Sequence, residues 1–274
     1  GASILKNLLY IKLLMCIAFV IFNFDKNIPL MILTNRDEQF NRKTLPMDWY
    51  ELEDNQSKVL CARDVSSGGA QFAIYQNHQF AVLTVFRETH SNSTNKNYIS
   101  RGNLITMLNS LTIEEYKKYL MENYDKYLGF NLIFGTINDV NFFSNRDRKN
   151  PYILKKITSN FGIGNGYHDE PWWKVTHGFD LLSRSDCTND SLLKILLNDE
   201  LAPLDKVQIT GYDKSFEHGL SGIFCHGMED KKGKFGTIGS YIHKFINNNQ
   251  IVHMETIEYC KKINSKVIYI TQIK

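Results

Sequence analysis

The 274-residue sequence predicts an α+β protein with a largely antiparallel sheet, and three observations support this fold class. The composition, 43% hydrophobic and 22% charged, is that of a globular chain that can bury a sizeable core. Apolar runs of strand length come in pairs joined by short polar turns, which is typical of hairpins. Helical segments are grouped instead of alternating one for one with strands, which argues against a repeating βαβ unit. No break in composition marks a boundary, so a single domain is expected.

The first predicted elements are two strands near the amino-terminal end. Residues 8–24 are apolar apart from Lys12 and one asparagine, and Lys12 leaves a run of ten uncharged residues, too short to span a bilayer comfortably. Residues 16–22 are rich in β-branched and aromatic side chains, which favours a buried strand; a cleaved signal peptide is the alternative. A polar turn over 25–29 and a second apolar run over 30–34 complete a predicted hairpin.

The same reasoning places the remaining elements in order. Strands are predicted over 59–62, 72–75, 80–85, 130–135, 140–144, 221–225, 237–243, 251–259 and 266–270, and an exposed polar loop over 89–97. Thr112 and Glu115 form a capping box ahead of apolar residues at helical spacing. Further helices are predicted after Asp169, with Pro171 in the first turn and an end near Ser183, and over 190–197.

Charge and cysteine content exclude several functional classes. The net charge of +3 is too small to indicate a nucleic-acid partner by itself. The five cysteines are widely spaced and include no C-x-x-C, which argues against a structural zinc site and a disulfide framework and favours a reducing compartment. His168, His177, His226 and His253 have no histidine partner at i+3 or i+4. We therefore expect no metal site, no nucleic-acid partner and no transmembrane span.

A series of motifs, in order along the chain, resembles one known family. They are Met15-Cys16-Ile17, Asn35-Arg36-Asp37-Glu38, Cys61-Ala62-Arg63-Asp64 with Gly68-Gly69, Ala81-Val82-Leu83-Thr84 with Arg87, Ser100-Arg101-Gly102, Gly129-Phe130-Asn131-Leu132-Ile133, Asn145-Arg146, Gly162-Ile163-Gly164-Asn165, Pro171-Trp172, Lys174-Val175, Gly236-Thr237 and Glu255. Together they resemble the NRDE family, whose eukaryotic members are called transport and Golgi organisation protein 2.

This resemblance runs from Met15 to about the carboxyl end and implies a fold. The family looks like a member of the amino-terminal-nucleophile (Ntn) hydrolase superfamily. The expected architecture is an αββα sandwich, two stacked and mainly antiparallel sheets between helix layers, formed as one domain over 15–274. Residues 1–14 are then expected to be an extension, a leader or a cloning remnant.

The resemblance also implies a set of candidate catalytic residues. In a hydrolase of this type Cys16 would be the nucleophile, with its own α-amino group as base. Arg36 and Asp37 would lower the thiol pKa and orient the amine, and the Asn165 side chain would donate to an oxyanion. An equally simple interpretation is structural: Cys16 as a small buried apolar residue, Arg36 and Asp37 as an ion pair, and Asn165 in a left-handed turn.

Three departures from the family pattern argue against efficient catalysis. Residues 1–14 precede Met15, so Cys16 has no free amine in this sequence. Val85 stands where the family has Asn, and Ile238 stands where it has Arg. Losing one oxyanion donor typically slows such enzymes by roughly a hundredfold or more. The chain is therefore expected to retain the site without efficient turnover.

The function implied by the resemblance is intracellular haem trafficking of a chaperone type, linked by the family name to Golgi organisation and protein secretion. Haem or another apolar small molecule would be the ligand, with no cofactor required. Haem acceptors or secretory-pathway proteins would be partners. The expected compartment is the cytoplasm, with mitochondrial or Golgi association as alternatives. Two other hypotheses stay open: a Cys-dependent amidohydrolase with Cys16 as nucleophile, which requires cleavage between Met15 and Cys16, and an interaction protein in secretory organisation.

Overall fold

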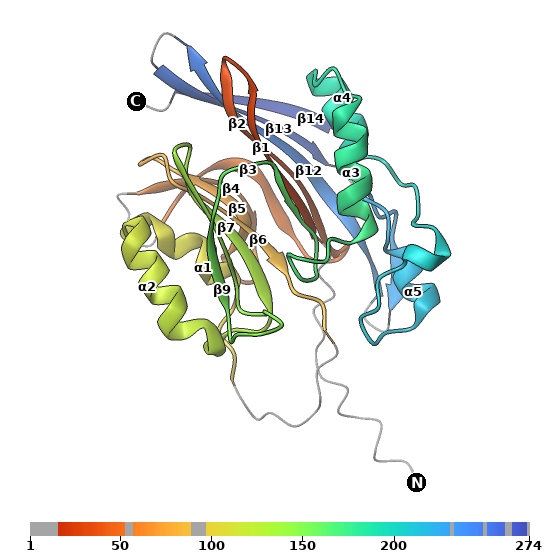
Figure 1. Cartoon of the computed structure of the whole chain (residues 1–274). Helices are drawn as coiled ribbons and strands as arrows, with labels where there is room; N and C mark the ends of the chain where they lie inside the picture. Colours follow the sequence, from red (N-terminus) through yellow and green to blue (C-terminus); the bar gives the residue numbers. More distant parts are fainter. Residues whose placement is uncertain are drawn as a thin grey trace.

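Two antiparallel sheets stack face to face in the computed structural model of the chain (Figure 1). The structure describes residues 16–52, 57–88, 97–230, 233–248, 251–260 and 265–272. The predicted extension over 1–14 and residues 89–96 of the predicted polar loop lie outside the described residues.

The first sheet holds the amino-terminal hairpin near its centre and has seven strands among the described residues. Its spatial order is β10 (Phe161–Ile163), β1 (Cys16–Asp25), β2 (Ile28–Gln39), β12 (Gly233–Asn248), β13 (Ile251–Cys260) and β14 (Ser265–Gln272), with β11 (Met228–Asp230) paired to β12. Cys16 pairs with Arg36 across β1 and β2, and Arg36 pairs in turn with Gly239 of β12. The start of β1 therefore lies where three strands meet.

The second sheet is a meander in which neighbours in sequence are neighbours in space. Its order is β3 (Thr44–Glu51), β4 (Lys58–Asp64), β5 (Ala70–Tyr75), β6 (Phe80–Val85), β7 (Phe130–Thr136), β8 (Asp139–Ser144) and β9 (Ile153–Ile157). The connection from β6 to β7 carries α1 (Gly102–Met107), α2 (Ile113–Asn123) and two 3₁₀ turns.

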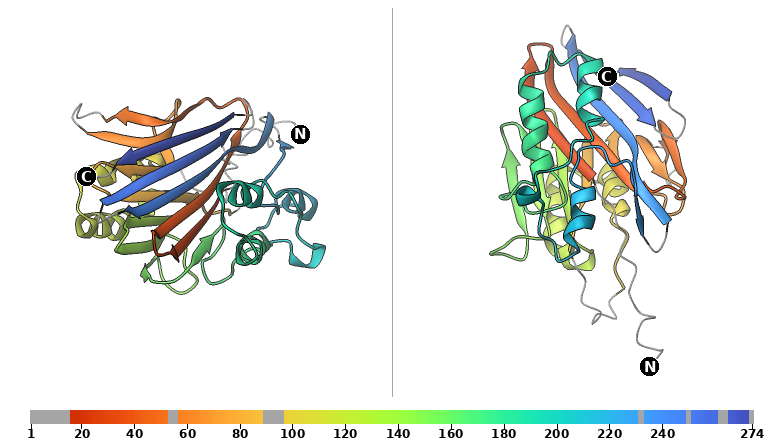
Figure 2. Two further views of the ribbon diagram at one scale, coloured as in Figure 1. Left: turned by 90° about the horizontal axis from the view of Figure 1, so that it is seen from above. Right: turned by 90° about the vertical axis from the view of Figure 1, so that its right-hand side faces the viewer.

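Helices cover the outer face of each sheet. The helices α1 and α2 lie on the second sheet, whereas α3 (Trp173–Ser183) and α4 (Asn189–Leu196) lie on the first (Figure 2). Their apolar side chains belong to the buried clusters on those outer faces. The short helix α5 (Lys214–Gly219) follows α4 after a loop that contains a 3₁₀ turn. The arrangement confirms the αββα sandwich of two antiparallel sheets between helix layers.

The first part of β1, residues 16–22, is apolar without interruption because it is covered on both faces. Ala18 and Val20 face the second sheet, whereas Ile17, Phe19 and Ile21 face the helix layer. Successive side chains of a strand point to opposite faces, so a strand covered on both faces needs apolar residues throughout.

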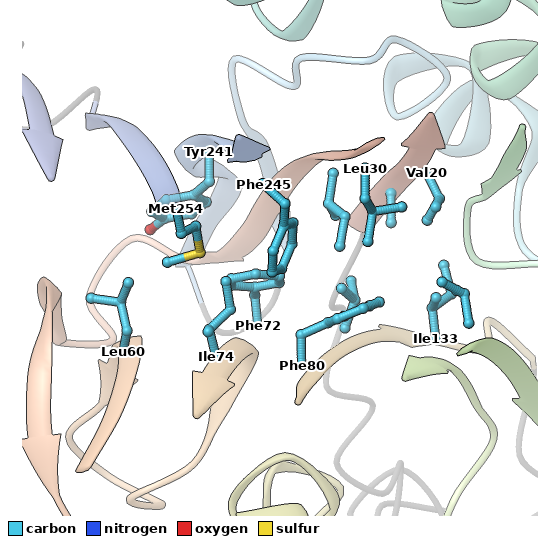
Figure 3. Close-up of a cluster of buried hydrophobic side chains, with 14 of the residues drawn as sticks. Val20, Leu30, Leu60, Phe72, Ile74, Phe80, Ile133, Tyr241, Phe245 and Met254 are labelled. Carbon is cyan, nitrogen blue, oxygen red and sulfur yellow. The ribbon is translucent and has the colours of Figure 1, made fainter. Parts of the chain in front are cut away.

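The space between the sheets is filled by apolar side chains from both of them (Figure 3). Val20, Leu30 and Phe245 come from the first sheet and meet Phe72 and Phe80 of the second. All five are 3% exposed or less. This layer fixes the distance between the sheets and therefore the relative position of residues that belong to different sheets.

Most predicted elements are confirmed with longer bounds. The hairpin forms with its turn at Lys26 and Asn27. The capping box forms as well: Glu115 N–H donates to Thr112 Oγ1 at 3.2 Å, and Thr112 N–H donates to a Glu115 carboxylate oxygen at 2.8 Å. Strands β3, β9, β10 and β11 were not predicted. They are edge strands with partly exposed polar residues, so they lack a strong apolar signal.

Two predictions are wrong. Residues 221–225 form a buried loop and not a strand, because their backbone groups bond outside any ladder: Phe224 N–H donates to Asn198 O, and Ile223 O accepts from the Asn35 side chain. The apolar pattern of residues 221–225 therefore indicates that they are buried, and it does not indicate a strand. Helix α3 begins at Trp173, so Pro171 precedes the helix instead of lying in its first turn.

In the described residues, none of the helices has the length and apolar character needed to cross a bilayer.

Candidate functional site

Cys16 is the first residue of β1, lies where residues of both sheets line one cavity, and is only 4% exposed. Its backbone N–H donates to Asn165 Oδ1 at 3.1 Å. This contact follows from topology: Ile163 of β10 pairs with Ala18 of β1, so the chain that leaves β10 runs past the start of β1 two residues later. The structure thus brings Cys16 and Asn165 together although 149 positions separate them.

Asn165 joins three segments and is fully buried. Its side-chain N–H donates to Val85 O at 2.7 Å, and its own carbonyl accepts from Arg87 N–H at 2.7 Å. Asn165 is not among the described residues with positive φ, so the left-handed interpretation is wrong. At least one amide N–H of this predicted oxyanion donor is therefore already bound to the backbone at the end of β6.

Arg36 and Asp37 are neighbours on β2 and make contacts with different partners. Arg36 lies 3.2 Å from Asp64 of the second sheet, whereas Asp37 accepts from Thr237 Oγ1 of β12 at 2.7 Å. The alternative in which Arg36 and Asp37 pair with each other is wrong, because consecutive strand residues point to opposite faces. Only Arg36 of the two lines the cavity next to Cys16.

The electrostatics keep the Cys16 thiol protonated. Burial, with the added charge of Asp37, raises the thiol pKa to about 12, although a hydrogen bond from the Asp37 backbone and the charges of Arg36 and Lys174 oppose the rise. Burial likewise raises the pKa of Asp37 to about 6, opposed by Lys174 and by the Thr237 hydrogen bond. The expectation that the Asp37 charge lowers the thiol pKa is therefore wrong, whereas that for Arg36 has the right sign.

A cavity of about 70 Å³ opens beside the thiol, and we call it the Cys16 cavity. It is lined by Cys16, Arg36, Glu38, Arg42, Asp64, Ser67, Gly69, Ala70, Gln71, Leu83, Val85, Ser100, Arg101 and Gly102. Val85 is thus part of the lining at the position where the family has Asn. Ile238 lies in a bulge of β12, opposite Arg36 and Asp37. Both departures noted in the sequence fall at or beside the site.

Sequence reasoning did not select five charged residues of the site: Glu38, Arg42, Asp64, Arg101 and Lys174. Lys174 of α3 is 2% exposed, its Nζ has no hydrogen-bond partner, and its charge interacts with Asp37 and Cys16. Arg101, ahead of α1, lines the Cys16 cavity. For Lys174 the sequence holds a usable signal, namely a lysine on the otherwise apolar face of a predicted helix. Arg101 is positioned by a tertiary contact that leaves no local pattern in the sequence.

The Asn165 side chain links Cys16 to Val85, and we call this link the Asn165 bridge. A second and larger cavity lies on the other side of this bridge from the Cys16 cavity, and we call it the aromatic groove. Its volume is about 530 Å³. It is lined by Phe86, Arg87, Glu88, Arg148, Gly166, Tyr167, Glu170, Pro171, Trp172, Trp173, Asp205, Lys206, Val207, Gln208, Ile209 and Thr210. Val85 lines the Cys16 cavity and the next two residues line the groove, so the segments 85–87 and 165–167 form the wall between the two.

Among the described residues there is no cluster of three or more His, Cys, Asp and Glu side chains that could hold a metal ion.

Three solved structures that are similar to this chain represent two kinds of hydrolase. A Caenorhabditis elegans N-acylethanolamine-hydrolyzing acid amidase ortholog is 10% identical, with 83% of this chain and 92% of that chain covered and a TM-score of 0.41. A mutant of the conjugated bile acid hydrolase from Clostridium perfringens is 11% identical (93% and 96% covered, TM-score 0.42), and a further variant of it is 10% identical (93% and 92% covered, TM-score 0.47).

The comparison of sequences identifies the family. No curated protein matches the chain. The family model described as Transport and Golgi organisation 2 matches residues 15–259, which is most of the sequence and includes every residue of the site described above. The chain therefore belongs to the Transport and Golgi organisation 2 family.

Proposed function

We propose that the protein binds and hands on haem or another flat apolar anion, and that the aromatic groove holds the ligand. The observation that carries this proposal is the groove itself: about 530 Å³ lined by four aromatic residues and three cations. Ligand sites for small molecules usually measure about 300–1,000 Å³. The Cys16 cavity, at about 70 Å³, is too small for a porphyrin.

The groove offers contacts for both parts of such a ligand. Phe86 and Tyr167 meet edge to face at 4.8 Å between ring centroids, and Trp172 and Trp173 lie in the same lining. These rings suit the face of a flat apolar molecule. Arg148 lies over the Tyr167 ring at 4.5 Å and can meet a carboxylate at the edge of the ligand.

The same lining predicts reversible binding. Its described residues include no His, Cys or Met, so Tyr167 is the candidate axial ligand for an iron. Glu88, Glu170 and Asp205 lie among the cations, and Arg148 already pairs with Glu170. Moderate affinity is what a protein that passes its ligand to an acceptor requires.

Titration of the purified protein with haem tests the proposal. We expect a saturable Soret change and transfer of haem to an apo-acceptor. Arg148→Ala should weaken binding severalfold. Arg184→Ala is the matched control, because Arg184 is also exposed and paired with an acid, Asp180, but lies outside the groove. Absence of a saturable Soret change, or equal effects of both variants, would contradict the proposal.

A second candidate, amide hydrolysis by Cys16, is favoured by one observation. Asn165 Oδ1 holds the Cys16 nitrogen, which is the atom that would act as base after cleavage of the bond between residues 15 and 16. The thiol proton would pass to that amine, and the thiolate would attack a carbonyl carbon. With residue 15 attached the nitrogen is an amide and cannot accept the proton.

Intact-mass analysis separates the two candidates. A mature chain that begins at Cys16, and that is labelled at Cys16 by an amide-mimicking electrophile, would support hydrolysis. A chain that retains Met15 and shows no labelling of Cys16 would exclude it and leave ligand binding as the proposed function.

A further inference from the structure

One positive charge in the Cys16 cavity is left without a carboxylate. The charged lining residues are Arg36, Arg42 and Arg101 against Glu38 and Asp64, which leaves one net positive charge. The neighbouring thiol adds no charge, since it is protonated. A cavity with an excess cation in a partly desolvated setting favours an anion.

The two acids of the cavity are occupied by two of the three arginines. Asp64 accepts from Arg42 Nε and, at 3.0 Å, from Arg42 Nη2, and it lies 3.2 Å from Arg36. Glu38 lies 3.6 Å from Arg42 and 3.9 Å from Arg36. Burial raises the pKa of Glu38, which can only reduce its negative charge. The pairs Arg36–Arg42 and Glu38–Asp64 therefore neutralise each other.

Arg101 is the excess cation. It is 8% exposed, and the contact of its side chain is a hydrogen bond from Nη1 to Gly129 O at 2.8 Å. Among the described residues none of the carboxylates lies within 4.0 Å of it, and Glu88, the carboxylate whose charge affects Arg101 most, is bound by Arg146. Burial lowers the pKa of Arg101 to about 10, so it remains charged at neutral pH.

Backbone packing fixes Arg101 at this place. A Cβ atom on Gly69 would lie 2.7 Å from the Gly102 Cα, so the two glycines bring the turn before β5 and the start of α1 into direct backbone contact. Arg101 is thereby held in the lining of the cavity. Any larger residue at either glycine would push it away.

We propose that the Cys16 cavity is a binding site for a small aliphatic carboxylate, held by Arg101 with its carbon chain against Leu83 and Val85 beside the thiol. The volume of about 70 Å³ admits a molecule of a few heavy atoms, and Leu83 and Val85 supply the apolar part of the lining. This site lies on the opposite side of the Asn165 bridge from the aromatic groove, so it is independent of haem binding.

Acetate and its neutral analogue acetamide provide the test on the unaltered protein. A ligand that binds only the folded state raises the unfolding midpoint in proportion to its occupancy. We expect acetate to raise the urea midpoint saturably, whereas acetamide, or chloride at the same ionic strength, does not. A rise with acetate that does not saturate, or an equal rise with acetamide, overturns the proposal.

Variants locate the effect. Arg101→Met should abolish the increment from acetate, Arg101→Lys should retain part of it, and Arg184→Met, outside the cavity and paired with Asp180, should leave it unchanged. An increment that survives in Arg101→Met overturns the proposal. If that variant does not fold, alkylation by iodoacetamide decides: acetate must slow modification of Cys16 severalfold and leave that of the less buried Cys260 unchanged, and equal rates with and without acetate overturn the proposal.

Discussion

Replacing Asn165 by alanine tests whether the bridge at the candidate site is also a principal stabilising contact. The Asn165 side chain accepts from Cys16 N–H and donates to Val85 O, and all three residues are buried. Asn165→Ala removes both contacts and leaves a buried donor and a buried acceptor without their partner.

The structure sets the size of the effect. Leaving a buried hydrogen-bonding group unsatisfied costs about 1–3 kcal/mol. Two such groups predict a loss of about 2–6 kcal/mol of the free energy of unfolding. Asn160→Ala is the matched control, because Asn160 also accepts a β1 backbone N–H, that of Phe22 at 2.9 Å, but at an exposed site. Water can replace that contact, so we expect a loss below about 1 kcal/mol.

Urea unfolding of the three proteins at one pH gives the two free-energy differences by linear extrapolation. The slope should stay the same, since neither variant changes the surface exposed on unfolding. A loss below about 1 kcal/mol for Asn165→Ala, or equal losses for both variants, would refute the reasoning. Faster alkylation of Cys16 in Asn165→Ala alone would further show that the bridge also limits access to the thiol.

Three further changes probe other parts of the structure by urea unfolding. Glu217→Gln should cost about 3–5 kcal/mol, because it removes the carboxylate that binds the Arg87 guanidinium in a pair whose side chains are 4% and 1% exposed. Asp37→Asn should flatten the pH dependence between about pH 4 and 6. The folded-state pKa of Asp37 is raised, so the contribution of Asp37 to stability is largest below about pH 4 and falls, by up to about 3 kcal/mol, as pH rises to 6. Gly178→Ala should destabilise by about 1–3 kcal/mol, because its Cβ would lie 2.2 Å from the Phe19 ring.

Exposed positions supply the controls for these three changes. Asp180→Asn breaks an exposed ion pair with Arg184 and should change stability by less than about 1 kcal/mol. Thr176→Ala lies on the exposed face of α3 and should have an effect within about 0.5 kcal/mol. Equal effects of a buried change and its control would contradict the corresponding prediction.

The fold was predictable where local pattern and tertiary role agree. The apolar run that starts at Cys16 predicted a buried strand, and β1 is buried on both faces. The capping box at Thr112 predicted α2 because its hydrogen bonds are local. The edge strand β10 was missed because three residues held mainly by pairing with β1 leave too short a pattern to detect.

The site was predictable only in part, for a related reason. Motif resemblance selected Cys16 and Asn165, which the structure places in contact. Their contact depends on the pairing of β10 with β1, which no local sequence pattern reports. Arg101 owes its place to two glycines 33 positions apart in the sequence, which meet only in the folded chain.

The structure also changes the meaning of the departures from the family pattern. In the sequence, Val85 in place of Asn reads as one lost donor. In the structure, the carbonyl of Val85 takes an N–H of Asn165, and the Val85 side chain lines the cavity instead of a polar group. The substitution itself therefore removes one donor and makes the cavity wall apolar next to a thiol that burial keeps protonated. The backbone carbonyl of residue 85 occupies an N–H of Asn165 whatever the side chain at that position, so a second donor is engaged independently of the substitution. Both features weaken an oxyanion site, and the apolar wall favours a cavity that retains a small ligand beside Cys16.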